Sequence, residues 1–396
     1  MKKVLIYHKR SSTSLGGDCF ILLKFIAELQ KSCEVTLALD FDFGLAHAAE
    51  IFDVPIDLSG MKIVTIDPGN GFLSGCDLIK SFHRIRRLKK LAEDADVCIS
   101  TVNVFDFGKP GHQFVCILSS LEGKAFYDYV MKVRTKTGLR RLARKFSTLI
   151  EENVVKPLLG IRPTRRIIRD PREHIYPTSH YVEGIMRGYF GSFNSRVFYP
   201  PTTFELDAAP VERDPLQVTY IGRIFAPKRL TDIIAVVESA RALTQRDLKL
   251  SIAGELQQDR YSELLKKLAE ERPWLRLVGP KYGKDKERFL LSGTYAIQAE
   301  KDETFGICIT EYLKAGMVVL VPNDGGPKEI VDDPELTFDT NEAAARILAR
   351  LVSDEAFRAE KLRHCAERAA DFTPQAYMAR QHRLLEHIVN PAESER

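Results

Sequence analysis

The amino-acid sequence predicts an α/β protein made of two Rossmann-like domains. Its length of 396 residues suits two domains of ordinary size. In both halves, short apolar runs alternate with stretches of helical periodicity, the pattern of parallel sheets with helices on both faces. The composition, 44% hydrophobic and 28% charged, is typical of a soluble globular protein with a large core.

The first domain is predicted to span residues 1–200. The apolar run Val4–Tyr7 is its first strand, and a polar loop with Gly16 and Gly17 leads into a helix and a second strand. This order of strand, glycine loop, helix and strand is a βαβ unit. Further strands are expected over residues 62–66, 97–101 and 113–118, and a helix over residues 78–92.

Two adjacent prolines, Pro200 and Pro201, mark the domain boundary because they fix an extended connection that cannot continue a helix. The second domain is predicted over residues 211–372. Its strands are expected over residues 218–221, 248–252, 275–278, 295–298 and 318–321. The last segment, 373–396, contains one long helix that is expected to pack back on the first domain.

Several classes of protein are disfavoured. The seven cysteines are scattered, odd in number and lack a Cys-x-x-Cys pair, which predicts reduced thiols rather than a disulfide or metal framework. The N-terminus is too poor in apolar residues for a signal peptide, and no stretch approaches the roughly 18 apolar residues that span a membrane. We therefore expect a cytoplasmic protein, either free or peripheral at the inner membrane face.

The strongest indication of chemistry is a pair of glutamates, Glu303 and Glu311, separated by seven residues with Gly306 between them. Gly306 stands where a helix is predicted to begin, so a ligand can approach the backbone and a phosphate would be attracted to the free N–H groups. Glu303 can accept hydrogen bonds from sugar hydroxyls, and Glu311 can reach ribose hydroxyls. Two solvated glutamates around an ordinary helix are the simpler alternative for this spacing.

Two other loops add to this pattern. Gly325 and Gly326 follow a predicted buried strand, where adjacent glycines suit a ligand held against backbone amides, although a plain turn has the same appearance. Arg223 and Lys228 flank the loop after the first strand of the second domain. A guanidinium fork and an ammonium at such a position could neutralise a diphosphate.

Together these residues resemble a known family, the retaining glycosyltransferases of family 4, which have the GT-B fold. The motifs that carry the resemblance are Gly222-Arg223, Lys228, Glu303-x7-Glu311 and Gly325-Gly326-x2-Glu329-Ile330-Val331. It is detailed from about residue 195 onward and patchy before that. The resemblance implies two facing Rossmann-like domains, an inter-domain cleft and a donor site in the C-terminal half.

The resemblance also implies a role for each matching residue. Arg223 and Lys228 would hold the donor diphosphate and Glu303 the donor sugar, and these three form the predicted catalytic set. The other residues predicted to bind the donor are Gly16, Gly17, Gly222, Phe305, Gly306, Ile307, Glu311, Gly325 and Gly326. The donor would be a nucleotide-diphosphate sugar, with no cofactor and no metal, because the cations replace the metal.

The chain departs from the family at two positions. Many relatives carry a histidine after the fourth strand of the first domain, whereas here the segment 114–121 has none and His112 precedes the strand. Gln298 stands where close relatives often have histidine. The string Asp40-Phe41-Asp42 is similar to a metal-binding motif of a different glycosyltransferase fold, but three-residue strings arise readily by chance, so no metal site is expected.

The sequence thus predicts transfer of a hexose from a nucleotide-diphosphate sugar to a hydroxyl acceptor, with the anomeric configuration retained. Two alternatives stay open: a sugar-nucleotide epimerase of the same architecture, and a glycosyltransferase-like binding subunit without activity. The base, the sugar and the acceptor are not identified. The Gly-Gly-Pro at 325–327 is similar to mannosyltransferases that act on lipid-linked sugars, which slightly favours GDP-mannose.

Positive charge is concentrated late in the first domain. Between Lys132 and Arg172 there are thirteen Lys and Arg against three Asp and Glu. One interpretation is a solvated helical face; the other is contact with anionic lipid headgroups or a lipid-diphosphate acceptor. The residues that could form this face are Arg140, Arg141, Arg144 and Lys145. Nucleic acid is not expected, because no aromatic interleaving or known module appears.

Overall fold

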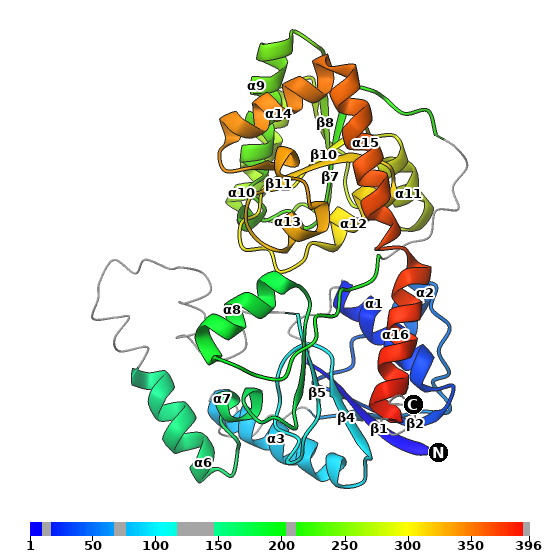
Figure 1. The fold of residues 1–396 in the computed structure, drawn as a ribbon, viewed down its shortest axis with the longest axis vertical. Coiled ribbons are helices and arrows are strands. Elements are labelled where there is room, and N and C mark those ends of the chain that lie inside the picture. The colour runs from blue at the N-terminus through cyan, green and yellow to red at the C-terminus, as the bar shows by residue number, and fades with distance from the viewer. Residues whose placement is uncertain (10–16, 67–76, 117–145, 203–210, 391–396) are drawn as a thin grey trace. The chain divides into compact units, whose positions relative to one another are not determined.

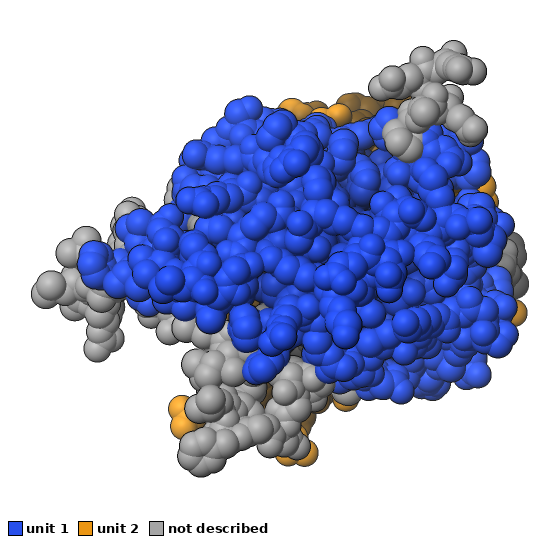
Figure 2. Space-filling view, turned by 90° about the horizontal axis from the view of Figure 1, so that it is seen from below, with its two compact units in different colours: residues 1–199, 379–396 blue, residues 200–378 orange. Residues whose placement is uncertain are grey.

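The computed structural model of the protein describes residues 1–9, 17–66, 77–116, 146–202 and 211–390. The chain divides into two compact units, coloured separately in Figure 2. Unit 1 comprises residues 1–199 and 379–396, and unit 2 comprises residues 200–378. Each unit is described on its own below.

Unit 1 is built on a six-stranded sheet with the strand order β3-β2-β1-β4-β5-β6. The strands are β1 (Lys2–His8), β2 (Cys33–Leu39), β3 (Lys62–Thr65), β4 (Val97–Ser100), β5 (His112–Val115) and β6 (His174–Pro177). All neighbours pair in parallel, for example β1 with β2 from Lys2↔Cys33 to His8↔Leu39. The last five residues of β1 are all buried, as expected for a parallel strand covered on both faces.

The helical elements of unit 1 lie between its strands in the sequence or follow the last of them. They are α1 (Gly17–Leu29), α2 (Leu45–Ile51), α3 (Asp77–Glu93), the π-helix η2 (Glu151–Val155), α6 (Lys156–Leu158), α7 (Thr164–Ile168) and α8 (His180–Phe190). The hydroxyl of Ser179 caps α8 by accepting the N–H of Val182 at 3.1 Å, and Gly191, with φ of 83°, ends it.

Unit 2 repeats the same plan, with the strand order β12-β11-β10-β7-β8-β9. The strands are β7 (Gln217–Ile221), β8 (Lys249–Ala253), β9 (Leu275–Leu277), β10 (Tyr295–Ile297), β11 (Val318–Pro322) and β12 (Thr337–Phe338). The first and fourth strands of the unit, β7 and β10, lie side by side, as β1 and β4 do in unit 1. This is the strand order of Rossmann folds.

Helices connect the strands of unit 2 (Figure 1). Those that precede β11 are the 3-10 turn η3 (Ala226–Lys228), α9 (Leu230–Thr244), α10 (Arg260–Glu270), α11 (Gly283–Leu291) and α12 (Ile307–Lys314). Those that follow it are α13 (Gly326–Val331), the 3-10 turn η4 (Pro334–Leu336), α14 (Asn341–Ser353) and α15 (Glu355–Ala370). Helices α9 and α14 pack against each other, and so do α12 and α15.

The last helix, α16 (Pro374–Val389), begins in unit 2 and ends in unit 1. Within unit 1, Nδ1 of His382 lies 2.8 Å from a carboxylate oxygen of Glu28 on α1. At the end of the helix, the ammonium of Lys2 donates to the carbonyl of Val389. The C-terminal part of α16 is therefore held to α1 and β1.

The predicted fold class is confirmed, since both units are parallel α/β sheets flanked by helices. Most predicted elements are present with ends shifted by one or two residues, for example the helix expected over 78–92, which is α3 (Asp77–Glu93). The prediction was less accurate for β5, which begins at His112 and ends at Val115 instead of spanning 113–118. An apolar run indicates a strand but does not define where pairing stops.

Candidate functional site

The predicted site residues of unit 2 follow three neighbouring strands. Strand order reverses between β7 and β10, and in open parallel sheets ligands bind beyond the carboxyl ends of the strands at such a point. Arg223 and Lys228 follow β7, Glu303 follows β10, and Gly325 follows β11. The topology therefore brings three separate sequence motifs to one edge of the sheet.

The two predicted cations lie against the same aromatic ring. The guanidinium carbon of Arg223 is 5.0 Å from the ring centre of Phe225, and Nζ of Lys228 is 6.0 Å from it. Cation–π contacts of this kind orient a charge without neutralising it. Arg223 is exposed, and no carboxylate within the described residues pairs with it.

Lys228 is nearly buried and forms a cluster with two glutamates. Its ammonium donates to Oε2 of Glu303 at 2.6 Å and also to Oε2 of Glu300, and the Lys228 side chain is 12% exposed. Glu300 was not among the predicted site residues. Sequence spacing gave no reason to choose it, because nothing before folding distinguishes it from a solvated glutamate.

The three groups of this cluster shift one another's pKa. Burial, together with the hydrogen bond and charge of Glu303, raises the pKa of the Glu300 carboxyl. Burial opposes ionisation of Glu303 too, but the charge of Lys228 and a hydrogen bond from Glu300 lower its pKa below the usual range. Burial also opposes the charge of Lys228, yet the two glutamates raise its pKa. These directions favour a proton on Glu300, a charged pair of Lys228 and Glu303, and a cluster of no net charge.

The loop that carries Glu303 packs directly on the start of α13. The N–H of Gly326 donates to the carbonyl of Glu303 at 2.8 Å, and the N–H of Gly325 donates to Oδ1 of Asp324 at 2.9 Å. A Cβ added to Gly325, whose φ is +81°, would lie 2.8 Å from the same carbonyl oxygen. In this structure the glycine pair thus permits close backbone packing, and both of its amides donate within the protein.

Helix α12 begins at the position predicted for a phosphate. Gly306 precedes it with φ of +84°, in the left-handed region, and as a glycine it provides no side-chain cap for the first N–H groups. Such a helix start carries partial positive charge and open donors. Phe305 is buried and its ring packs 6.1 Å from that of Phe372, so its backbone rather than its side chain is available. Ile307 is the first helical residue.

Glu311, predicted to reach ribose, is 3% exposed. Nζ of Lys286, on α11, donates to its Oε1 at 2.6 Å. Lys286 was not among the predicted site residues, because it lies on a different helix from Glu311 and 25 residues away in the sequence. The phenol of the next residue, Tyr312, accepts the N–H of Ile221 at 2.8 Å, which ties α12 to the end of β7.

Gln298 follows β10 and is 1% exposed. Its Oε1 accepts the N–H of Ala299 at 3.0 Å. Its Nε2 is buried without a hydrogen-bond partner among the described residues. A buried amide donor without a partner is costly, so this group has unused donor capacity at the carboxyl edge of the sheet.

Gly16 lies outside the described residues, and so do Arg140, Arg141, Arg144 and Lys145. Gly17 is the first residue of α1. His112 opens β5 and stacks on His174 with 4.8 Å between ring centres, and burial lowers its pKa to about 3. These surroundings are those of a core histidine.

The two aspartates of the Asp-x-Asp string are each bonded within unit 1. Asp40 accepts a hydrogen bond from Tyr7 at 2.7 Å and pairs with Arg84 at 3.1 Å. Asp42 accepts the N–H of Gly44 at 2.9 Å. Within the described residues, no group of three or more His, Cys, Asp or Glu is arranged to hold a metal ion.

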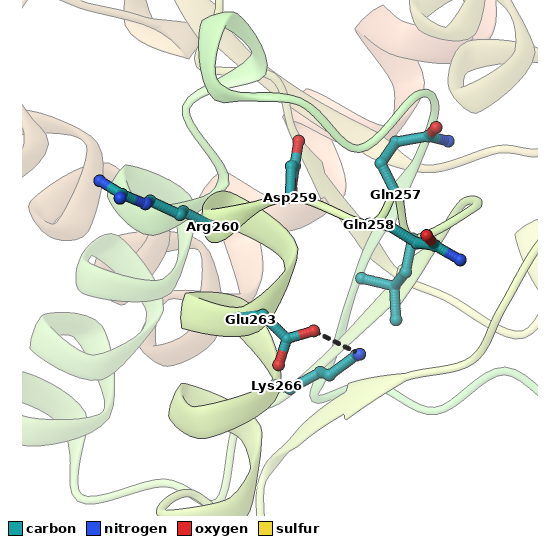
Figure 3. A pocket seen from close by; sticks show the side chains of 7 residues that line it. Gln257, Gln258, Asp259, Arg260, Glu263 and Lys266 are labelled. Carbon is teal, nitrogen blue, oxygen red and sulfur yellow. Dashed lines mark hydrogen bonds and ion pairs between the residues drawn. The ribbon is translucent and has the colours of Figure 1, made fainter.

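A separate surface hollow follows β8 (Figure 3). Its lining residues are Leu256, Gln257, Gln258, Asp259, Arg260, Glu263 and Lys266. The polar groups there serve the helix itself: Asp259 caps α10 by accepting the N–H of Ser262 at 2.8 Å, and Glu263 pairs with Lys266 at 2.8 Å. No predicted site residue lines this hollow.

Comparison with known proteins finds one family model that matches part of the chain. Residues 203–372 match the family model for glycosyl transferases group 1. This segment contains every predicted site residue except Gly16 and Gly17. No curated protein matches the chain in sequence.

Solved structures resemble the chain over nearly its whole length. HepE from Anabaena, in complex with UDP and glucose, has a TM-score of 0.64 and 12% identity, with 99% of this chain and 100% of that chain covered. WaaG, a glycosyltransferase involved in lipopolysaccharide biosynthesis, has a TM-score of 0.66 and 11% identity, with 98% and 100% covered. Sucrose-phosphate synthase from Thermosynechococcus elongatus has a TM-score of 0.66 and 13% identity, with 99% and 100% covered.

At such low identity the likeness defines the fold alone. The protein has the GT-B fold of glycosyltransferase structures. Its second unit is the part that matches glycosyl transferases group 1.

Proposed function

We propose that the protein is a retaining glycosyltransferase that moves a hexose from a nucleotide-diphosphate sugar to a hydroxyl acceptor. The observation that carries this proposal is the placement of Arg223, Lys228, Glu303 and the start of α12 at one edge of the unit-2 sheet. The group 1 match and the presence of UDP and glucose in the HepE structure support a nucleotide-sugar donor.

In the proposed reaction, the bond between the anomeric carbon and the diphosphate oxygen breaks while the acceptor oxygen bonds to the same face of that carbon. The diphosphate oxygen takes the acceptor proton. Arg223, Lys228 and the N–H groups after Gly306 stabilise the negative charge that grows on the leaving group, which is electrostatic catalysis by preorganised groups. Glu303 orients the sugar, and Glu311 holds the ribose.

Lys228 has to change partners during this cycle. It is bonded to Glu300 and Glu303 in this structure, so a diphosphate oxygen would replace one carboxyl. Glu300 is the group to be displaced, because its raised pKa makes the neutral acid the weaker partner. Lys228 then keeps Glu303 in position while it contacts the leaving group.

The proposed chemistry needs no metal, because two cations and a helix start provide the positive charge. Activity should therefore survive EDTA, and Asp42→Asn, which removes one acid of the Asp-x-Asp string, should be mild. Loss of turnover in EDTA that Mn²⁺ or Mg²⁺ restores would contradict this mechanism.

We propose a glycan or lipid-linked acceptor, reached from the cytoplasmic face of a membrane and used in polysaccharide or glycolipid synthesis. The support is the basic stretch with Arg140, Arg141, Arg144 and Lys145, which suits anionic headgroups. No helix in the described part of the chain is long and apolar enough to cross a membrane.

The first experiment is a donor screen with UDP-, GDP- and ADP-sugars, followed by NMR of the products. Transfer with retained anomeric configuration is the expected result. A new epimer formed from donor alone would indicate the epimerase alternative. Donor binding with neither hydrolysis nor transfer, across candidate acceptors, would indicate a binding subunit. Comparing UDP-glucose with GDP-mannose tests which nucleotide the donor carries. The HepE complex favours UDP, whereas the Gly-Gly-Pro sequence at 325–327 favours GDP.

A further inference from the structure

A cluster of apolar side chains lies exposed on the helical segment that precedes α7. The backbone is helical over 146–150 and continues through η2 and α6. We call the following residues the apolar stripe: Phe146, Leu149, Ile150, Val154 and Leu158. All five are exposed, Phe146 by 65% and Leu158 by 81%. Their spacing of mostly three or four residues places them along one side of a helix.

The opposite side of this segment is polar and holds it to unit 1. Thr148 and Glu152 are its buried residues between 146 and 160. Glu152 accepts the N–H of Thr164 at 2.8 Å and pairs with Lys156, whose ammonium also donates to the Thr164 hydroxyl at 3.1 Å. The segment is thus anchored through polar contacts with its apolar stripe outward, so the stripe is not part of the unit-1 core.

The stripe is concentrated as well as exposed. Five of the thirteen large apolar side chains that are exposed in the described chain belong to it. Scattered exposed apolar residues need no explanation, but a contiguous set marks an interaction surface. In Figure 1 the helix labelled α6 lies at the periphery of unit 1, away from its sheet.

The charge around the stripe indicates what covers it. The sequence from 132 to 145, immediately before it, has seven Lys and Arg and no Asp or Glu, and Arg166 and Arg169 after it are exposed. Phe and Leu on one side of a helix, in a part of the sequence rich in Lys and Arg, suit the surface of an anionic bilayer. A second copy of the chain suits it less, because both copies would have the same excess of Lys and Arg in the sequence next to the contact.

We propose that the apolar stripe inserts into the headgroup region of an anionic bilayer and anchors unit 1 there. This deepens the proposed membrane-linked function, since it adds an apolar anchor to the electrostatic one. Insertion of such a helix reaches about 5–10 Å into the boundary between headgroups and acyl chains. The polar contacts of Glu152 hold the helix in place while its outer side is buried.

The test is co-sedimentation with vesicles of phosphatidylcholine alone or with one third phosphatidylglycerol. The full chain should pellet with the anionic vesicles. The double variant Phe146→Ser/Leu158→Ser should bind about a hundredfold more weakly, roughly tenfold for each buried side chain. The matched control is Leu243→Ser/Leu264→Ser, which removes two exposed leucines of unit 2 and should bind like the wild type.

A second test uses tryptophan fluorescence and reports insertion directly, without a variant that has lost binding. Leu158→Trp should shift its emission to the blue on adding anionic vesicles, whereas Leu243→Trp should not, against the common background of Trp274. Binding that high salt abolishes but the double serine variant leaves unchanged would overturn the apolar anchor. A dimer seen by sedimentation of the wild type and lost in the serine variant would also overturn it, in favour of a second copy.

The result is separable from the proposed function. Vesicle binding that depends on the stripe, in a protein without transferase activity, would support the anchor and contradict the function. Transfer to a short water-soluble acceptor, with no vesicle binding even at low salt, would support the function and overturn the anchor.

Discussion

Lys286 and Glu311 form an ion pair of 2.6 Å between α11 and α12, with the glutamate side chain 4% exposed. The pair fixes one oxygen of the carboxylate that we propose binds ribose. A buried carboxylate held in place by a charge-assisted hydrogen bond is preorganised for its ligand. Lys286 is therefore a positioning residue of the proposed donor site.

Replacing Lys286 by Gln should weaken donor binding more than it slows the chemical step. Glu311 would lose its charged partner, while the groups around the diphosphate would stay in place. We expect a KM for the donor raised about tenfold with kcat within about a factor of two. Steady-state kinetics and calorimetric titration with the nucleoside diphosphate measure both. Lys266→Gln breaks a more exposed pair with Glu263 and serves as the control, and an equal effect there would sink the assignment.

Arg223→Ala should lower kcat about a hundredfold or more, because losing one preorganised contact to a developing charge costs roughly 2.7–4 kcal/mol of barrier. Lys228→Ala should have a similar effect on turnover. The two variants should differ in stability. Arg223 has no ion pair within the described residues to lose, whereas removing Lys228 leaves Glu300 and Glu303 without their cation.

Thermal unfolding and single-turnover rates separate these effects. The midpoint should fall for Lys228→Ala and stay near the wild-type value for Arg223→Ala. Arg260→Ala, at the surface hollow and outside the cluster, is the control for removing a cation. Near-normal rates in both site variants would show that Arg223 and Lys228 do not stabilise the negative charge on the leaving group.

The contrast between Glu303 and Glu300 shows what sequence reasoning could reach. Glu303 was predicted because its motif lies within a few residues along the chain. Glu300 and Lys286 were not, since their importance comes from neighbours about 72 and 25 residues away that only folding brings close. Local patterns indicate strands, turns and helix starts, but they do not indicate which charged side chains pair with each other in the folded protein.

Gly325 and Gly326 illustrate a different limit. The sequence indicated that backbone must approach something closely there, and the structure shows that the neighbour is the Glu303 loop. One short strand was also missed: β6 has the sequence HIYP and lacks the apolar run that indicated the other short strands. The fold class was predictable because it depends on repeated alternation along the whole chain.

Glu300→Gln should change how stability depends on pH. The folded-state pKa of Glu300 is raised, so the unfolded chain ionises first as pH rises, and the wild type loses stability between the ordinary carboxyl range and that raised pKa. Glutamine does not ionise. The free energy of unfolding of the variant should therefore rise relative to that of the wild type on going from pH 5 to pH 9, with a limiting slope of about 1.4 kcal/mol per pH unit. The thermal unfolding midpoint should rise with it.

Glu303 acts in the opposite direction and provides the comparison. Its folded pKa is lowered, so its contribution is present above the ordinary carboxyl range and is lost as pH falls through the folded value. Glu303→Gln should cost stability near neutral pH and less in acid. Parallel pH profiles for the two variants would show that the proton is not held by Glu300 as inferred.

Gly325→Ala should damage both stability and turnover, because two separate penalties meet at this position. The backbone has φ of +81°, and the added Cβ would lie 2.8 Å from the carbonyl oxygen of Glu303. A positive φ combined with ψ of -178° is a backbone conformation that essentially only glycine adopts, and it costs about 1–3 kcal/mol for a residue with a Cβ. Relieving the clash must then move the loop that holds Glu303 against Lys228.

Gly279→Ala is the matched control, since Gly279 has φ of +69° with no atom within 4 Å of an added Cβ. Gly279→Ala bears a penalty for its positive φ without the clash. Its midpoint should fall modestly while kcat stays unchanged. The unfolding midpoint of Gly325→Ala should fall further. Its kcat should also drop about tenfold or more, because misplacing a sugar-orienting group weakens transition-state contacts. Equal kcat in the two variants, despite a lower midpoint for Gly325→Ala, would mean that close packing of the glycine pair supports the fold of unit 2 and not the position of Glu303.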